Sequence, residues 1–231
     1  MEYANYEALR EKILGRGVVV AIDGPSGSGK STISRNVAAA LDLGYLDTGA
    51  MYRAAAWGVE HRGVDLNDPI AIAAAVQDMK LTVNAVPHAP RIFVDGIDVM
   101  HVIRTDHINT IVSAVSSVPE VRTVLIALQR DIIAQAREST RGIVVEGRDI
   151  TTVVAPDAQV RILLTASAAT RVSRRALEDQ GDARSETLDR ERALVLDRDA
   201  RDAKVTSFHE AADGVTCLLY TSPSPRDATL S

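Results

Sequence analysis

The chain has 231 residues, of which 46% are apolar and 25% are charged, and its formal net charge is −5. These values are typical of a globular domain with a substantial core, and the acidic balance argues against broad attraction to nucleic acid. No apolar run reaches the roughly 18 residues of a membrane span, the first residues do not resemble a signal peptide, and Cys217 is the single cysteine. We therefore expect a cytoplasmic monomer with neither nucleic-acid nor membrane partners.

The predicted elements alternate between helices and strands. Residues 1–14 predict a short helical extension, and the continuous apolar stretch 18–23 predicts a buried parallel strand. In the first half of the chain we next expect a helix through 33–41, a short strand at 45–47, an alanine-rich helix from 48 and a helix at 70–79. A hairpin of 81–86 and 91–94 and a long helix from 119 follow. The remaining expected elements are buried strands at 143–146 and 160–165, a helical arginine-rich segment at 168–204 and a last strand at 214–219. This alternation predicts an α/β fold, a three-layer sandwich whose central parallel sheet binds ligands at the carboxyl ends of its strands.

The most informative motif follows the first strand. The segment Gly24-Pro25-Ser26-Gly27-Ser28-Gly29-Lys30-Ser31 fits the pattern G-x-x-x-x-G-K-[ST] without a mismatch, and it lies between a predicted strand and a predicted helix. In that context the loop N–H groups and the start of the helix hold phosphate oxygens, a lysine reaches the β- and γ-phosphates, and a hydroxyl ligates Mg²⁺. The sequence therefore predicts a nucleoside triphosphate site from Gly24 to Thr32, with Lys30 and Ser31 in these two roles.

The last residues do not continue the alternation. Residues 220–231 contain two prolines and no periodic apolar face, although an edge strand is usually followed by a covering element. The segment can be a disordered terminus or foreign sequence joined to a truncated reading frame, and we favour the second interpretation. We accordingly expect a domain over residues 15–217 and an atypical tail over 218–231.

Three polar clusters accompany the predicted elements, and each has an ordinary structural interpretation. The segment Asp47-Thr48-Gly49-Ala50-Met51-Tyr52-Arg53 can simply start a helix, with Asp47 or Thr48 as its N-cap. Glu146-Gly147-Arg148-Asp149 follows a strand, where it can be a charged turn or can place Glu146 to hold a water on Mg²⁺. The arginines between 168 and 204 alternate with acids, as in a solvated helix with i,i+4 ion pairs.

Taken together, the clusters are more specific. The chain resembles bacterial cytidylate kinases over about residues 17–216, because five segments occur in that family's order: 24–31, 47–53, 112–122, 146–149 and 198–202. There are departures from the family pattern. The family has a further arginine near the position of Val205, where Lys204 is the nearest cation in this chain. Thr151 stands in place of a glycine and is expected to restrict its loop. The segment after the last strand also differs.

The resemblance implies an inserted monophosphate-binding lobe at about residues 65–120, a helical lid at about 170–205, and transfer of phosphate from ATP to CMP and dCMP with Mg²⁺. It implies an ATP site over 24–32 with Arg171 and Arg175 from the lid, catalytic roles for Lys30, Arg148 and Arg198, and a metal site of Ser31 with Glu146 acting through water. The CMP site that it implies consists of Thr48, Arg53, Ser113, Arg122, Arg148, Asp149, Arg198 and Asp202.

Two alternatives stay open on the sequence. A kinase of the same fold can act on UMP, AMP or a non-nucleotide acceptor such as shikimate, although the absence of an N-K-x-D segment removes the usual signal for guanine. A nucleotide-binding protein without transferase activity would carry the same phosphate loop.

Overall fold

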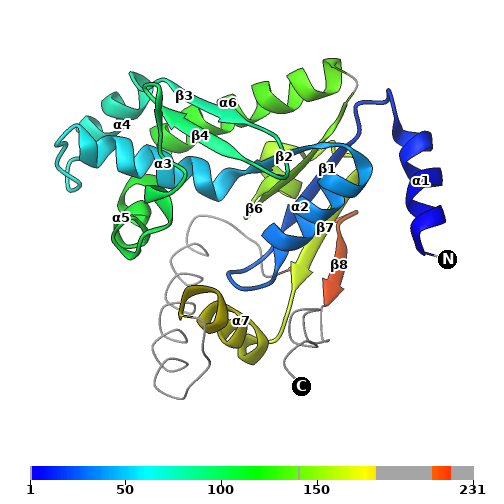
Figure 1. The fold of residues 1–231 in the computed structure, drawn as a ribbon. Helices are drawn as coiled ribbons and strands as arrows, with labels where there is room; N and C mark the ends of the chain where they lie inside the picture. The colour runs from blue at the N-terminus through cyan, green and yellow to red at the C-terminus, as the bar shows by residue number, and fades with distance from the viewer. Residues whose placement is uncertain (1, 140, 181–209, 220–231) are drawn as a thin grey trace.

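In a computed structural model, residues 2–139, 141–180 and 210–219 are described, and they contain a five-stranded parallel sheet in the order β2-β6-β1-β7-β8 (Figure 1). Its strands are β1 (Val19–Asp23), β2 (Gly44–Asp47), β6 (Ile143–Gly147), β7 (Val160–Thr165) and β8 (Thr216–Leu219). The α/β fold and the central parallel sheet predicted from the alternation of elements are confirmed.

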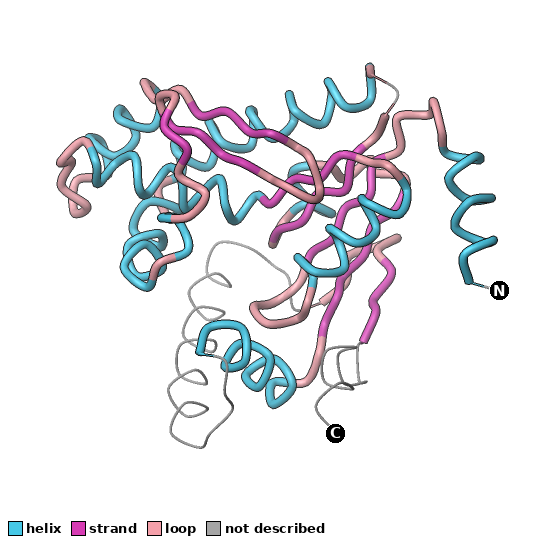
Figure 2. The backbone as a smooth tube through the Cα atoms, viewed as in Figure 1, coloured by secondary structure: helices cyan, strands magenta, loops and turns pink. Residues whose placement is uncertain are grey.

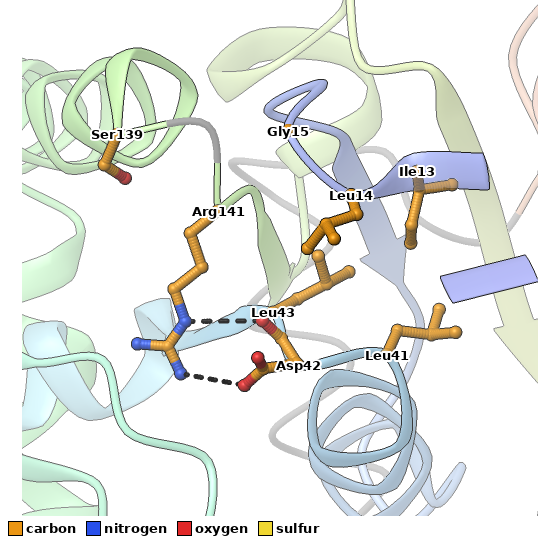
Figure 3. Close-up of a pocket in the computed structure, with 8 residues that line it drawn as sticks. All are labelled: Ile13, Leu14, Gly15, Leu41, Asp42, Leu43, Ser139 and Arg141. Atoms are coloured by element: carbon orange, nitrogen blue, oxygen red, sulfur yellow. Dashed lines mark hydrogen bonds and ion pairs between the residues drawn. The ribbon is translucent and has the colours of Figure 1, made fainter. Parts of the chain in front are cut away.

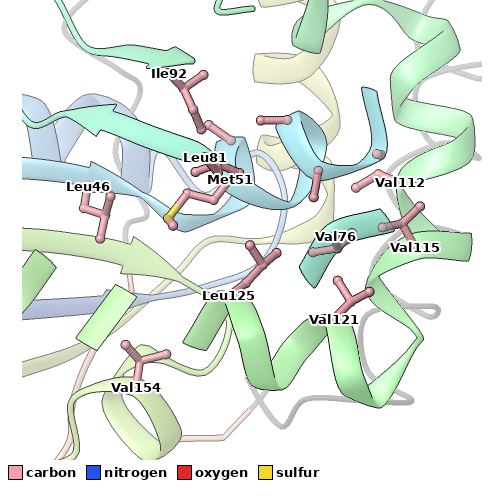
Figure 4. Packing of buried hydrophobic residues seen from close by; sticks show 14 of the residues in the cluster. Leu46, Met51, Val76, Leu81, Ile92, Val112, Val115, Val121, Leu125 and Val154 are labelled. Atoms are coloured by element: carbon pink, nitrogen blue, oxygen red, sulfur yellow. The ribbon is translucent and has the colours of Figure 1, made fainter. Parts of the chain in front are cut away.

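Side chains of each strand alternate between two apolar layers because the backbone is pleated. Val20 and Ile22 of β1 face α2 (Lys30–Leu41), against which α1 (Glu2–Ile13) packs. Val19 and Ala21 face the larger core, which is built from α3 (Thr48–His61) and α6 (Pro119–Glu138) (Figure 4). The sheet is thus covered on both faces, as a parallel sheet requires.

A second, antiparallel sheet lies on the side of α3 and extends the same core. It has the order β3-β4-β5, from β3 (Leu81–Asn84), β4 (Arg91–Val94) and β5 (Ile97–Asp98), and Figure 2 shows its two longer strands beside the helices. Around it lie α4 (Pro69–Gln77), the 3₁₀ turn η1 (Val102–Arg104) and α5 (Asp106–Ser116). The Tyr45 N–H donates to the Ala85 carbonyl at 2.9 Å and so ties this sheet to β2.

Several predicted elements are confirmed within one or two residues, including the N-terminal helix, the hairpin and the long helix from Pro119. The first hairpin strand ends at Asn84 and not at Val86 as predicted, because Pro87 and Pro90 occupy the connection. The sequence did not indicate α5, β5 or the π-helical segment η2 (Ile150–Val154). Of the predicted helical segment 168–204, α7 (Ala168–Gln180) is present and the remainder lies outside the described residues.

A cavity of about 290 Å³ lies at the amino ends of the strands, between the end of α1, the end of α2 and the residues before β6 (Figure 3). Arg141 crosses its mouth to Asp42, donating from Nε to the carbonyl at 3.3 Å. The phosphate loop leaves the opposite, carboxyl end of β1, so this cavity is separate from the predicted nucleotide site. In the described part of the chain, no single helix is long and apolar enough to cross a membrane; α5 and α6 together have that length and composition, but are bent by 102°.

Leu125 tests how much the larger core contributes to stability. Its side chain is 1% exposed on the buried face of α6, so Leu125→Ala should lower the free energy of unfolding by about 2–5 kcal/mol in urea titrations. Ile70→Ala is the control, because Ile70 is 81% exposed on α4 and should change stability by less than about 0.5 kcal/mol. Equal effects of the two substitutions would contradict this assignment of the core.

Candidate functional site

Three acidic residues end neighbouring strands of the parallel sheet. Asp23 ends β1, Asp47 ends β2, and Glu146 lies one residue before the end of β6. The strand register pairs Asp47 with Glu146 and Asp23 with Gly147, so the three residues lie at the carboxyl end of the sheet, with Asp23 and Glu146 on opposite faces. Asp23 and Glu146 are 2% and 1% exposed, so a cation or hydrogen-bond donors must balance each of them.

The phosphate loop bridges β1 and α2 at this edge, as predicted. Gly29 precedes α2 with φ at +84°, a left-handed conformation that favours glycine. A Cβ atom on Gly24 would lie 2.1 Å from the Leu164 carbonyl oxygen, so the loop passes directly over the end of β7. The helix N-terminus and the loop backbone thus form the kind of cradle that binds phosphate.

Four cationic side chains surround the phosphate loop and donate to its carbonyl groups. Arg148 Nη1 donates to Gly24 at 2.6 Å, and Lys30 Nζ donates to Pro25 at 3.4 Å. From α7, which lies beside the loop in Figure 1, Arg171 Nη1 donates to Ser26 at 3.0 Å and Arg174 Nη1 to Ser28 at 3.3 Å. Concentrated positive charge at a helix N-terminus favours a polyanionic ligand.

Glu146 lies between the phosphate loop and β2. Its carboxylate accepts a hydrogen bond from Ser31 Oγ at 2.9 Å and another from the Tyr45 hydroxyl. Burial raises the pKa of Glu146, and the negative charge of Asp47 raises it further, while Lys30 and the two hydroxyl donors lower it only in part. The protein's own groups therefore leave the charge of this carboxylate incompletely compensated.

Asp47 is compensated by arginines. Its side chain caps α3 by accepting from the Ala50 N–H at 2.9 Å, and it forms ion pairs with Arg53 at 3.6 Å and Arg104 at 3.5 Å. Burial raises the pKa of Asp47, but Arg53, Arg104 and the Ala50 N–H together lower it more, so the net shift is downward. The Asp47 carboxylate therefore holds two guanidinium groups near the end of β6.

Beyond the end of β6, Asp149 pairs with a helix of the larger core. Arg122, in the first turn of α6, contacts the Asp149 carboxylate at 2.5 Å, and the two side chains are 18% and 9% exposed. Burial raises the pKa of Tyr52, on α3, to about 12, and charge interactions with Arg122 and Asp149 partly offset each other there. This pair can bind an anion through its arginine and a hydrogen-bond donor through its carboxylate.

The residues around Glu146 fit a magnesium ion. A hydroxyl and a carboxylate lie 2.9 Å apart, and the carboxylate lacks a full counter-charge, which a divalent cation would supply. Among the described residues, no group of three or more His, Cys, Asp or Glu side chains could hold a metal alone. Such sparse ligation is typical of Mg²⁺, which keeps waters and substrate phosphates as its other ligands.

Known proteins identify the family. The cytidylate kinase family model matches residues 20–222. Relatives described as cytidylate kinase include those of Nocardia farcinica, 50% identical over 92% of this chain and 90% of the relative, and of Streptomyces griseus, 50% identical over 86% and 84%. The relative of Streptomyces avermitilis is 48% identical over the same shares, 86% and 84%.

The chain belongs to the cytidylate kinase family. The resemblance that the five sequence segments predicted is confirmed. The general activity of this family is phosphorylation of CMP and dCMP with ATP.

The structure brings together most of the predicted residues that it describes. Those of the phosphate loop adjoin Glu146, Arg148 and Arg171, and Arg122 adjoins Asp149. Thr48 is 3% exposed and its hydroxyl donates to the Glu146 carbonyl at 2.8 Å, which joins α3 to β6. Ser113 is half-buried on α5, a helix that packs against α3. Arg198, Asp202 and the side chain of Arg175 lie outside the described residues.

Several residues at the site were not predicted. Arg104 comes from η1, far along the chain from Asp47, and no local pattern indicates their ion pair. Arg174 lies against the phosphate loop, whereas the resemblance predicted contacts from Arg171 and Arg175 of the same helix. Arg174 and Arg175 follow Arg171 by three and four residues, so helical periodicity places both on its face and does not distinguish them.

Glu146→Gln tests the uncompensated charge through pH. Because the folded pKa of Glu146 is above the ordinary 4.5, the folded state binds this proton more tightly than the unfolded chain. The stability that this tighter proton binding contributes is present below the ordinary pKa and is lost as pH rises through the folded pKa. Without divalent cations, Glu146→Gln should therefore gain stability relative to wild type as pH rises above the ordinary pKa of 4.5, measured by urea unfolding.

The control for this measurement is Glu138→Gln, a substitution of an exposed carboxylate at the end of α6. Its stability difference from wild type should stay nearly constant over the same range. A constant difference for Glu146→Gln as well would show that its charge is compensated without a metal.

Proposed function

We propose that this chain transfers the γ-phosphoryl group of ATP to CMP and dCMP in an in-line reaction that uses Mg²⁺. The observation that carries the proposal is the turn 146–149, which reaches both halves of the site. Glu146 contacts Ser31 beside the phosphate loop, Arg148 contacts the loop at Gly24, and Asp149 contacts Arg122 on α6. A single short segment that contacts two anion-binding regions suits transfer between two phosphates.

On the ATP side, the loop amides of 24–32 and the start of α2 would hold the β- and γ-phosphates together with Lys30. Arg171 and Arg174 already lie on the loop carbonyls, so small side-chain rotations would bring their guanidinium groups to the phosphates. Arg175 would join them from the same helix. These cations stabilise the charge on the equatorial oxygens during transfer.

On the acceptor side, Arg53, Arg122 and Arg148 would hold the monophosphate. Asp47 keeps Arg53 beside the sheet edge, at 3.6 Å, and thereby limits the side-chain freedom that binding would otherwise cost. Asp149, Thr48 and Ser113 would contact the base or sugar. Arg198 and Asp202 complete this site in the proposal, on the strength of the family resemblance alone.

Ser31 and Glu146 would hold Mg²⁺, Ser31 directly and Glu146 through water. The ion neutralises phosphate charge when bound. Because burial and Asp47 disfavour the ionised form of Glu146 and Lys30 offsets this only in part, a bound cation would supply the remaining counter-charge. Tyr45 fixes its orientation through the second carboxylate oxygen.

The acceptor panel is the direct test. With ATP and Mg²⁺, coupled ADP release should be strong with CMP and dCMP, and weak with UMP, with AMP and without acceptor. Lys30→Ala should lower kcat at least about a hundredfold, because it removes a charge that stabilises the transition state. Lys12→Ala, on the exposed face of α1, is the control and should leave kcat unchanged. Folded wild-type protein that releases ADP with none of these acceptors would favour the nucleotide-binding alternative.

Asp149→Asn tests how the base is read. A carboxylate accepts from the exocyclic amine of cytosine, whereas uracil presents a carbonyl at that position, so the ratio of kcat/KM for CMP over UMP should fall about tenfold or more. Asp157→Asn is a matched control, because Asp157 also pairs with an arginine of α6, Arg137, at 2.7 Å. A ratio that is unchanged in Asp149→Asn would reject this role and leave Asp149 as a partner of Arg122 only.

A further inference from the structure

Asp23 lies at the centre of the site, but none of the contacts proposed above uses it. It is the last residue of β1, it directly precedes the phosphate loop, and it is 2% exposed. Its carboxylate makes three close contacts with one segment: Oδ1 accepts from the Ile150 N–H at 2.9 Å, and Oδ2 accepts from the Thr151 N–H at 2.8 Å and from Thr151 Oγ1 at 2.7 Å. A buried carboxylate is costly, so this arrangement calls for an explanation.

The three donors belong to the start of η2, the π-helical segment that follows Asp149. Its other end is held as well, because Arg130 donates to the Val153 carbonyl at 2.6 Å and to the Val154 carbonyl at 3.3 Å. Arg161 Nη1 lies 3.4 Å from the Thr151 carbonyl. π-Helical turns are rare and favour functional sites, and this one is held at both ends by charged side chains.

The contacts of Asp23 determine where Arg148 and Asp149 can lie. These two residues connect β6 to η2, so they are fixed on one side by the strand pairing of Asp23 with Gly147 and on the other by the Asp23 carboxylate. Arg148 then reaches Gly24, the residue after Asp23, and Asp149 reaches Arg122. One residue of β1 therefore sets both the start of the phosphate loop and the turn that carries two predicted acceptor contacts.

We propose that Asp23 is a positioning residue for the acceptor site, which it aligns with the phosphate loop through the backbone and hydroxyl of Thr151. The inference rests on the proposed function, because it concerns the positions of Arg148 and Asp149 as acceptor contacts. The Thr151 side chain, 3% exposed, adds a hydrogen bond that a residue without a hydroxyl could not make at this position. Asp23 itself touches neither substrate in this proposal.

Thr151→Val removes the hydroxyl and keeps the side-chain shape, so it tests the proposal with little change in packing. Titration calorimetry should give a Kd for CMP about tenfold higher than in wild type, because a small displacement of positioned groups is costly in such sites. The Kd for a non-hydrolysable ATP analogue with Mg²⁺ should change by less than about twofold, because the loop keeps its own contacts. Thr151→Ser, which retains the hydroxyl, should restore CMP affinity.

Thr152→Val is the matched control, since it is the same substitution one residue further along η2, on an exposed side chain. It should bind CMP as wild type does. Asp23→Asn, which replaces an acceptor oxygen with a donor, should lower kcat about a hundredfold. If Thr151→Val and Asp23→Asn both bind CMP with wild-type affinity, or if both nucleotides lose affinity equally, the proposed positioning role is wrong.

Amide hydrogen exchange separates this inference from the proposed function. In Thr151→Val, exchange at Arg148 and Asp149 should accelerate about tenfold, while exchange at Val144 and Val145 within β6 stays unchanged. If wild-type protein does not bind CMP, the proposed function fails, and this local acceleration alone then decides whether Asp23 holds the turn. Uniform acceleration through β6 would show a general loss of stability and would overturn the positioning role.

Discussion

The site depends on the balance of charge at one edge of the parallel sheet. The register of β1, β2 and β6 places Asp23, Asp47 and Glu146 at the carboxyl ends of neighbouring strands, where the charge of Asp47 raises the pKa of Glu146 and that of Asp149 raises the pKa of Asp23. Each is stabilised differently. Asp47 is held by two arginines, Asp23 by three hydrogen-bond donors, and Glu146 by two hydroxyl groups and the charge of Lys30. Glu146 is therefore the carboxylate that gains most from an added cation.

The same end of the sheet also gathers positive side chains, although the chain as a whole has a net negative charge. Positive side chains are concentrated where α2 begins, and those of Lys30, Arg148, Arg171 and Arg174 donate to carbonyl groups of the phosphate loop. A carbonyl partner orients a guanidinium group without neutralising it. These contacts therefore hold the guanidinium groups beside the place where the phosphates would bind.

Much of this could be predicted from sequence, because the relevant signals are local. The strand, loop and helix around Gly24 lie within about twenty residues, and each has a pattern that simple periodicity detects. Asp47 was predicted as a possible helix cap, and it is one. By contrast, the pair of Asp47 and Arg104, and the contact of Asp23 with Thr151, join residues 57 and 128 positions apart in sequence. No periodic pattern encodes such pairs. The π-helical segment was also missed, because its geometry is held by side chains of β1, α6 and β7 rather than by local propensity.

Helix α6 links the stability of the fold to the proposed acceptor site. Its buried face, with Leu125, Gln129 and Ile133, lies in the larger core, and its first turn presents Arg122 to Asp149. Further along, Arg130 of the same helix holds the end of η2, whose beginning is held by Asp23. The turn that carries Arg148 and Asp149 is therefore fixed between β1 and α6, two elements that the core itself immobilises. Because both supports belong to the buried part of the molecule, the core itself aligns the proposed acceptor contacts with the phosphate loop.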